Sequence, residues 1–177
     1  MMNTIEVEIR SFITKERYED LLRFFHTQGE KIIEDEQETH YFDTKEDIRI
    51  QKNKYSAKIW MKKGKMHDEQ REEIEIKIER DDFEKMEKIL FSLGHAVSIK
   101  WFRTRHAFLW QNITVTLDFT KGYGYIIELE KISSQDEKDV ALTMLKEKLT
   151  ELQIPLTPRE EFDKQFLWYK EHWREVV

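Results

Sequence analysis

Pairs of glutamates separated by one residue recur along this sequence, at Glu6 and Glu8, Glu73 and Glu75, and Glu128 and Glu130. Arginines and lysines are spread over the segments between these pairs. Carboxylates are hard oxygen ligands for divalent cations, and arginine and lysine side chains bind phosphate groups. Acids and bases that lined one enclosure would therefore bind a metal cation together with a polyanion, because buried charges need partners of opposite sign.

The elements that carry these residues follow from the surrounding pattern. Apolar and charged residues alternate around the glutamate pairs, which is typical of β-strands with one apolar and one charged face. The alternation predicts strands over residues 5–10, 48–51, 58–62, 73–79, 114–118 and 126–130. Residues two positions apart lie on the same face of a strand, so each glutamate pair shares a face.

Helical periodicity separates the strands, with apolar stripes over residues 18–25, 83–93, 142–152 and 162–173. Glycines and polar residues predict the ends of these helices. We expect Gly29 and Gly94 to end the first two helices and Asp81 to cap the second. Ser134 with Glu137 forms a capping box for the third, and the fourth should begin at Thr157 with Pro158 at its first helical position.

Two arrangements satisfy this pattern. The strands could close into a barrel with the helices outside and the charged faces lining a lumen, which also removes the sheet edges. Alternatively, a one-sided sheet could pack the helices on its apolar face and expose its charges to water, as antiparallel sheets commonly do. The pattern alone favours neither arrangement.

Composition bounds the remaining possibilities. The 177 residues fit a single domain, 1–177, because five glycines and two prolines mark no linker. Charged residues make up 37%, but 12% are aromatic, which excludes a disordered chain. The absence of cysteine excludes disulfides and thiolate metal sites and favours a cytoplasmic location. A net charge of −6 disfavours a duplex nucleic-acid partner, and no apolar run predicts a membrane partner.

Six motifs in order resemble those of the CYTH family, also called the triphosphate tunnel metalloenzymes. They are Glu6-Val7-Glu8-Ile9-Arg10, with Arg10 for the usual lysine; His40-Tyr41-Phe42-Asp43-Thr44; Ile48-Arg49-Ile50-Gln51, with Gln51 for a second base, followed by Lys62; Arg71-Glu72-Glu73-Ile74-Glu75; Arg103-Thr104-Arg105; and Leu117-Asp118 with residues 122–130. Ala57-Lys58-Ile59-Trp60 is an alternative match for the third motif, with Trp60 for its second base. The resemblance covers about residues 4–131 and leaves the helices of about residues 134–173 outside it.

The resemblance implies an α+β fold, in which an eight-stranded antiparallel barrel closes into a tunnel with a charged lumen and outer helices. It implies metal ligands at Glu6, Glu8, Asp118, Glu128 and Glu130. It implies substrate-binding cations at Arg10, Arg49, Lys58, Lys62, Arg103 and Arg105. Glu73, Glu75 and Lys62 are then expected to be catalytic. The final helix is expected either to close one mouth of the tunnel or to support a homodimer.

The implied function is hydrolysis of an inorganic or organic triphosphate with Mg²⁺ or Mn²⁺. A class IV adenylate cyclase, a non-catalytic polyphosphate or nucleotide binder, and an interaction domain with solvent-facing charges are the alternatives. His40, His67 and His106 lack metal-ligand spacing and are expected at the surface or around the site. Trp60 in a lumen would be suited to stacking on a planar ring of an organic substrate.

Overall fold

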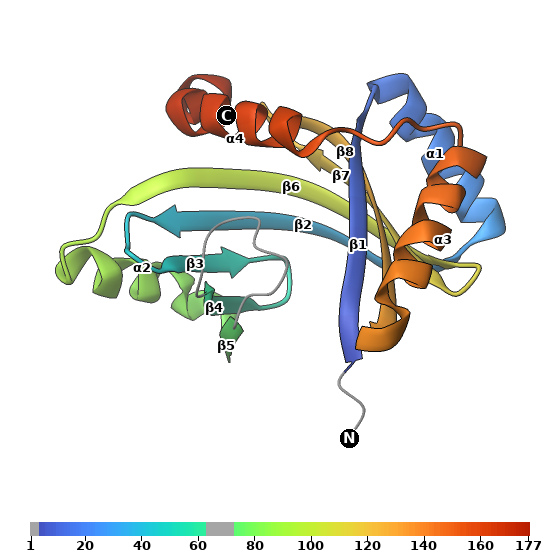
Figure 1. The fold of residues 1–177 in the computed structure, drawn as a ribbon. Coiled ribbons are helices and arrows are strands. Elements are labelled where there is room, and N and C mark those ends of the chain that lie inside the picture. Colours follow the sequence, from blue (N-terminus) through green and yellow to red (C-terminus); the bar gives the residue numbers. More distant parts are fainter. Residues whose placement is uncertain (1–3, 63–72) are drawn as a thin grey trace. The chain divides into compact units, whose positions relative to one another are not determined.

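The computed structural model of this chain describes residues 4–62 and 73–177 (Figure 1). Eight strands form one antiparallel sheet in the order β1-β8-β7-β6-β2-β3-β4-β5. Their bounds are β1 (Thr4–Ile13), β2 (Glu30–Phe42), β3 (Asp47–Lys52), β4 (Ala57–Lys62), β5 (Glu73–Ile78), β6 (Val97–Trp110), β7 (Ile113–Thr120) and β8 (Gly124–Ser134). The helices are α1 (Lys15–Gln28), α2 (Phe83–Ser92), α3 (Lys138–Glu151) and α4 (Arg159–Val176), with 3-10 turns at Arg80–Asp82 and Gln135–Glu137.

The chain forms two compact units, each built from separate stretches of the sequence. The first unit contains residues 1–34 and 104–169, and the second contains residues 35–103 and 170–177. Strands β2 and β6 and helix α4 therefore each contribute residues to both units.

The core of the first unit lies between its strands and two helices. Helices α1 and α3 contact β1, β7 and β8 (Figure 1). The strands contribute buried apolar residues such as Val7 and Leu129, and the helices contribute Phe25 and Leu145. These side chains come from the apolar faces of the alternating strands, so the charged faces lie on the opposite side of the sheet.

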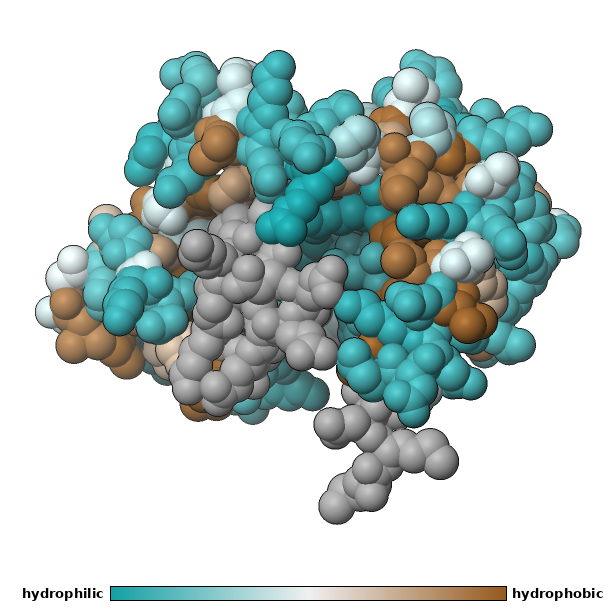
Figure 2. Space-filling view, viewed as in Figure 1, coloured by the Kyte–Doolittle hydropathy of each residue, from teal (hydrophilic) through white to brown (hydrophobic). Residues whose placement is uncertain are grey.

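The second unit has a smaller core under α2. Phe83 and Leu90 of this helix pack on Phe42, Ile50 and Ala57 of the sheet. The opposite side of the helix is also partly apolar, and Figure 2 shows brown residues gathered over α2. Exposed residues there include Ile89 and Phe91.

Helix ends agree only partly with the sequence-based expectations. Gly29 ends α1 as predicted, but its φ of −112° is open to any residue. A Cβ atom at this position would lie 3.2 Å from the Cβ of Phe108, so glycine allows close packing of the backbone here. Gly94 follows α2 with a φ of 89°, a left-handed conformation that favours glycine.

The residues that were expected to cap α2, α3 and α4 do not cap these helices in the structure. Asp81 lies inside the 3-10 turn, and α2 begins directly after this turn, at Phe83, without a side-chain cap. Ser134 hydrogen-bonds the Glu137 carboxylate at 3.1 Å, yet neither side chain caps α3. Helix α4 begins at Arg159, after Thr157 and Pro158, and the Thr157 hydroxyl instead accepts a hydrogen bond from the Phe12 amide at 3.0 Å.

The strand order ends at β1 and β5, and within residues 4–62 and 73–177 the structure does not show the closed barrel that we expected. What it does show is an α+β fold with an eight-stranded antiparallel sheet, with α1 and α3 on the apolar face of the first unit and α2 on that of the second. None of the helices in the described part of the chain has an apolar stretch long enough to span a bilayer.

Candidate functional site

The register of β1 and β8 brings the first and last glutamate pairs together in the first unit. Glu8 lies directly opposite Glu130, and Arg10 lies directly opposite Glu128. Glu6 shares this face, since it is two residues before Glu8. Strand β7 adds Thr116, which lies opposite Glu128. Side chains directly opposite one another in an antiparallel pair are about 5 Å apart at Cβ, so these groups form one cluster.

The cluster concentrates negative charge on two adjacent strands. Burial raises the pKa of Glu130, and the neighbouring carboxylates of Glu6 and Glu128 raise it further, while Arg105 opposes them. Like charges directly opposite one another destabilise a sheet, and a bound divalent cation would relieve this repulsion.

No ready-made metal site is present among residues 4–62 and 73–177, because no three His, Cys, Asp or Glu side chains converge closely enough. The donor set nevertheless fits a hard divalent cation. Glu6, Glu8, Glu128 and Glu130 offer only carboxylate oxygens, on two adjacent strands, which is the chemistry that Mg²⁺ and Mn²⁺ prefer.

Arg105 and Asp118 form a bidentate ion pair beside this cluster. Arg105 Nε donates to Asp118 Oδ1 at 2.9 Å, and Nη2 donates to Oδ2 at 2.7 Å. Burial opposes the charge of Arg105, but the hydrogen bonds and charge of Asp118 outweigh it and raise the pKa of the guanidinium. Both Asp118 oxygens are therefore engaged with Arg105, which fixes the direction of this cation.

The charged face of the second unit follows from the pairing of β3, β4 and β5. Trp60 lies opposite Arg49 on one side and opposite Glu75 on the other. Lys58 and Lys62 share its face, since each is two residues away along β4. The ladder therefore brings three predicted cations and one predicted catalytic glutamate to one face of this unit.

The cations of this face are held by carboxylates. Arg49 donates to both oxygens of Asp47, at 2.7 and 2.5 Å. Lys58 Nζ lies 2.5 Å from Glu75 Oε2. Lys62 pairs with Glu73 in the ladder, and the side chain of Glu73 lies outside what the structure describes.

An amide network positions Arg103. The Gln37 carbonyl oxygen accepts hydrogen bonds from Arg103 Nε at 3.1 Å and from Nη2 at 2.8 Å. The same oxygen accepts from Gln51 Nε2 at 3.0 Å, and the Gln37 amide donates to the buried Asp35 at 2.9 Å. Gln51, which replaces the second base of the family motif, thus helps to orient another cation.

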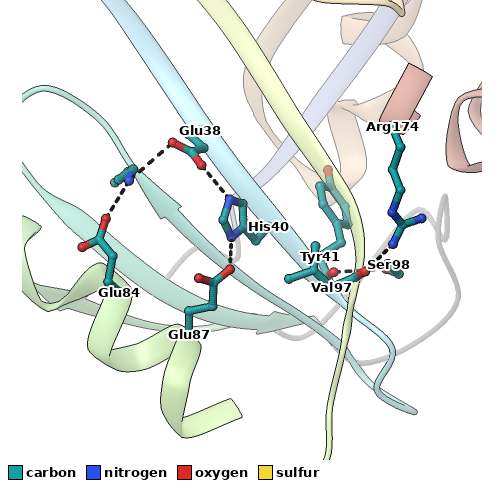
Figure 3. Close-up of polar contacts among 9 residues, drawn as sticks. Glu38, His40, Tyr41, Glu84, Glu87, Val97, Ser98 and Arg174 are labelled. Atoms are coloured by element: carbon teal, nitrogen blue, oxygen red, sulfur yellow. Dashed lines mark hydrogen bonds and ion pairs between the residues drawn. The ribbon is translucent and has the colours of Figure 1, made fainter. Parts of the chain in front are cut away.

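His40 was expected at the surface or around the site, but it is 2% exposed beneath α2. Figure 3 shows Glu38 and Glu87 reaching its ring from two sides. Its Nε2 lies 2.7 Å from Glu38, and its Nδ1 lies 2.7 Å from Glu87. Lys52 extends this network, with its Nζ 3.4 Å from Glu38 and 2.8 Å from Glu84.

This network lies on the α2 side of the second unit, where the sequence offers little sign of it. Glu87 lies 49 positions after Glu38 in the sequence, and neither belongs to a short motif. The only signal is that a helix with an apolar stripe also carries acids on the turns that meet β2 and β3.

The predicted site residues thus fall into two groups. The first unit brings together Glu6, Glu8, Arg10, Arg105, Asp118, Glu128 and Glu130. The second brings together Arg49, Lys58, Lys62 and Glu75 on β3 to β5, and contains Arg103 on β6. Arg71, Glu72 and His67 lie outside the described residues. His106, on β6, is partly buried, and its Nδ1 lacks a hydrogen-bond partner among the groups that the structure describes.

Comparison with known proteins decides the family. The model of the CYTH domain matches residues 4–167 of the chain. The chain belongs to the CYTH domain family. The CYTH match includes every predicted site residue and extends beyond the motifs into α4.

Individual relatives of this CYTH chain are distant. A Methanocaldococcus jannaschii protein named "putative adenylate cyclase" is 40% identical over 85 residues, which are 48% of this chain and 47% of that protein. The match thus spans about half the length of this curated relative.

Solved structures show the same fold. A conserved hypothetical protein from Pyrococcus furiosus aligns with a TM-score of 0.72 and 24% identity, over 88% of this chain and 96% of its own. A Vibrio parahaemolyticus structure, again named as a putative adenylate cyclase, has a TM-score of 0.65 and 14% identity, over 88% of this chain and 95% of its own.

Proposed function

We propose that this CYTH chain is a metal-dependent hydrolase of triphosphates, with inorganic triphosphate as the first substrate to test. The observation that carries the proposal is the separation of chemistry between the two charged faces. Acidic ligands gather on β1 and β8, and cations gather on β3 and β4. A triphosphate with a bound divalent cation needs both kinds of partner, because it combines several negative charges with a hard metal ion.

The proposed binding step uses the cations of both faces. Arg10, Arg49, Lys58, Lys62, Arg103 and Arg105 are proposed to bind the phosphate oxygens. Arginine offers paired donors for phosphate, and lysine offers a compact charge. Phosphoryl transfer depends mainly on positioning and on stabilisation of charge, so such cations also lower the barrier to reaction.

The carboxylates are proposed to hold Mg²⁺ or Mn²⁺, with Glu6, Glu8, Glu128 and Glu130 as ligands. When bound, the ion would screen phosphate charge and make water a better nucleophile. Glu73 and Glu75 are proposed to position the attacking water or to accept its proton, and Lys62 to stabilise the phosphoryl group. Asp118 is proposed chiefly to hold Arg105, since both of its oxygens already bind that guanidinium.

Closure of the sheet into a tunnel belongs to the same proposal. In a closed barrel the two charged faces would line one lumen, and the helices would stay on the outside. Helices α1 and α3 cover the apolar side of the first unit, and α2 covers that of the second, which supports this arrangement. Support of a homodimer by α4 also stays a proposal, as does a location in the cytoplasm.

The direct test is a substrate panel with the full chain. Phosphate release from inorganic triphosphate, thiamine triphosphate and ATP is measured with Mg²⁺ and with Mn²⁺, and cyclic AMP is measured in the ATP reactions. We expect metal-dependent phosphate release from at least one triphosphate. The absence of any phosphate release under either metal would contradict the hydrolase assignment.

Variants then test the metal ligands. Glu6→Gln and Glu128→Gln should lower phosphate release by roughly a hundredfold or more, because each removes a charged oxygen ligand. Glu147→Gln, at an exposed position of α3, is the matched control and should leave the rate unchanged. Full activity in both site variants would contradict the metal assignment.

Adenylate cyclase activity is the second candidate, because relatives of this chain carry that name. The chemistry differs in the nucleophile, which would be the ribose 3′-hydroxyl of ATP instead of water, and in the phosphorus attacked, which would be the α-phosphorus, with pyrophosphate as the leaving group. Formation of cyclic AMP with release of pyrophosphate would favour the cyclase over the hydrolase. Tight triphosphate binding without either product would favour a non-catalytic binder.

A further inference from the structure

An aromatic ring occupies the centre of the charged face of the second unit. Trp60 has Lys58 and Lys62 on either side along β4, and it lies between Arg49 and Glu75 across the ladder. Its side chain is 7% exposed. An indole here is unusual, because the neighbouring side chains on this face are charged.

Cations lie against the ring. Lys58 Nζ is 4.7 Å from the centre of the Trp60 ring, and the guanidinium carbon of Arg49 is 5.8 Å from it. Arg49 is closer still to Tyr41, at 4.2 Å from the ring centre, and Nη1 donates to the Tyr41 hydroxyl at 3.2 Å. All three distances to ring centres fall within the roughly 6 Å over which an aromatic ring attracts a cation.

Each of these cations has two kinds of partner. Arg49 also binds the carboxylate of Asp47, and Lys58 also binds that of Glu75. A carboxylate cancels the charge of the cation that it holds. A ring attracts the cation through its quadrupole and carries no net charge, so the positive potential toward an anion is retained.

We propose that Trp60, together with Tyr41, is a positioning residue that holds Arg49 and Lys58 over aromatic rings while a polyphosphate displaces Asp47 and Glu75 from them. The choice of a polyphosphate as the ligand in this inference rests on the proposed function. The rings limit how far the freed cations move, so less side-chain entropy is lost when the anion binds. A carboxylate in place of the indole would instead neutralise the cations and compete with the anion.

Affinity for inorganic triphosphate tests the inference. The affinity of the full chain is measured by calorimetry for wild type, Trp60→Leu and Trp60→Phe. Trp60→Leu should weaken binding roughly fivefold to thirtyfold, since two cation–ring contacts are lost. Trp60→Phe keeps a ring and should stay within about threefold of wild type. Trp168→Leu, at an exposed tryptophan of α4, is the matched control and should bind as wild type does.

A double-mutant cycle separates positioning from a general loss of structure. If Trp60 acts through the cations, Trp60→Leu should weaken binding much less in an Arg49→Gln background than in wild type. Additive losses, or a Trp60→Leu variant with wild-type affinity, would overturn the inference and leave the proposed function intact.

A measurement without ligand makes the two proposals separable. Protons held over an aromatic ring resonate upfield, so the side-chain NH signals of Arg49 should be shifted upfield in wild type. The shift should shrink in Trp60→Leu or Tyr41→Leu, whichever variants fold. If wild type binds no triphosphate, the proposed function fails. An unshifted Arg49 signal in wild type would overturn the holding of this cation by rings, whether or not triphosphate binds.

Discussion

The guanidinium carbon of Arg10 lies 4.7 Å from the centre of the Phe162 ring, which joins the first strand of the chain to its last helix. Phe162 is 4% exposed and also stacks on Phe12 at a centroid distance of 4.3 Å. The CYTH motif usually has a lysine where this chain has Arg10. A planar guanidinium stacks on an aromatic ring better than an ammonium group, so Phe162 gives the substitution a structural reason.

This contact predicts that Arg10 and Phe162 act as a pair. Arg10→Lys keeps the charge but loses the stacking, so we expect triphosphate affinity to fall about threefold to fivefold. In a Phe162→Leu background the same change should have little further effect. Calorimetric titration of wild type, the two single variants and the double variant with triphosphate measures the coupling between Arg10 and Phe162. An undiminished effect of Arg10→Lys in the Phe162→Leu background would show that the ring does not orient the cation.

The glutamate cluster on β1 and β8 predicts a pH-dependent cost to stability. The folded-state pKa of Glu130 is raised above 4.5, so the folded chain holds a proton over a window above pH 4.5 in which the unfolded chain does not. The free energy of unfolding therefore falls as pH rises through this window. Glu130→Gln should raise the melting temperature at pH 7 by roughly 1–3 °C, and this gain should vanish near pH 4.

Metal provides the complementary measurement for Glu130. Mg²⁺ or Mn²⁺ should raise the melting temperature of wild type, because the ion binds the folded state and relieves the repulsion. The increase should be smaller in Glu130→Gln and unchanged in Glu147→Gln. Equal responses of all three proteins would argue against Glu130 as a ligand.

Loss of the Arg105 partner should be among the most damaging changes of the site. Asp118 is 6% exposed and binds Arg105 through both oxygens. Asp118→Asn leaves a mostly buried cation without a charged partner, which should lower the free energy of unfolding by about 2–4 kcal/mol. Urea denaturation measures the loss, and Asp139→Asn, at an exposed position of α3, serves as the control. A change below about 0.5 kcal/mol would mean that the pair contributes little to stability.

The His40 network predicts a loss of stability in acid. The hydrogen bond from His40 lowers the pKa of Glu38 below 4.5, with Lys52 also favouring the charged form and burial opposing it. A lowered folded-state pKa stabilises the protein above about pH 4.5, and this contribution is lost as pH falls through the folded value. Glu38→Gln should therefore cost about 1–2 kcal/mol at pH 7, and the difference from wild type should shrink at lower pH.

Chemical denaturation from pH 7 down to the acid limit of folding tests the Glu38 prediction. Glu36→Gln, which removes an exposed charge from the same strand, is the control. A Glu38→Gln deficit that stays constant with pH would indicate lost packing instead of a lost charged hydrogen bond.

Much of the sheet could be predicted from the sequence because its strands alternate so regularly. The alternation at residues 5–10 and 126–130 predicted β1 and β8 and the face on which each glutamate lies, whereas the pairing of Glu8 with Glu130 depends on a register that only the structure shows. The alternation did not predict β2 or β6, and the first half of β2, Glu30 to Gln37, reads as a charged segment without clear alternation. Its strand state depends on neighbouring strands, which periodicity does not report.

The partners of individual charges were harder to predict. Alternation places Arg105 on a face, but only the register of β6 against β7 brings it to Asp118. His40 was expected at the surface or around the site, since nothing in the local sequence reveals that α2 brings Glu87 to it. The sequence suggested only that a lumen Trp60 would be suited to stacking on a ligand, and it gave no sign of the cations that the structure places against its ring. Each of these contacts depends on pairing or packing between separate elements, so local patterns carry no information about them.

The division of the chain between its two units has a consequence for synthesis on the ribosome. The core cluster that contains Val7 of β1 is complete only when α3, with Leu149, has emerged. The second unit likewise takes residues 170–177 from the far end of the chain. We therefore expect the nascent first unit to remain open to proteases and chaperones until its α3 residues have been synthesised.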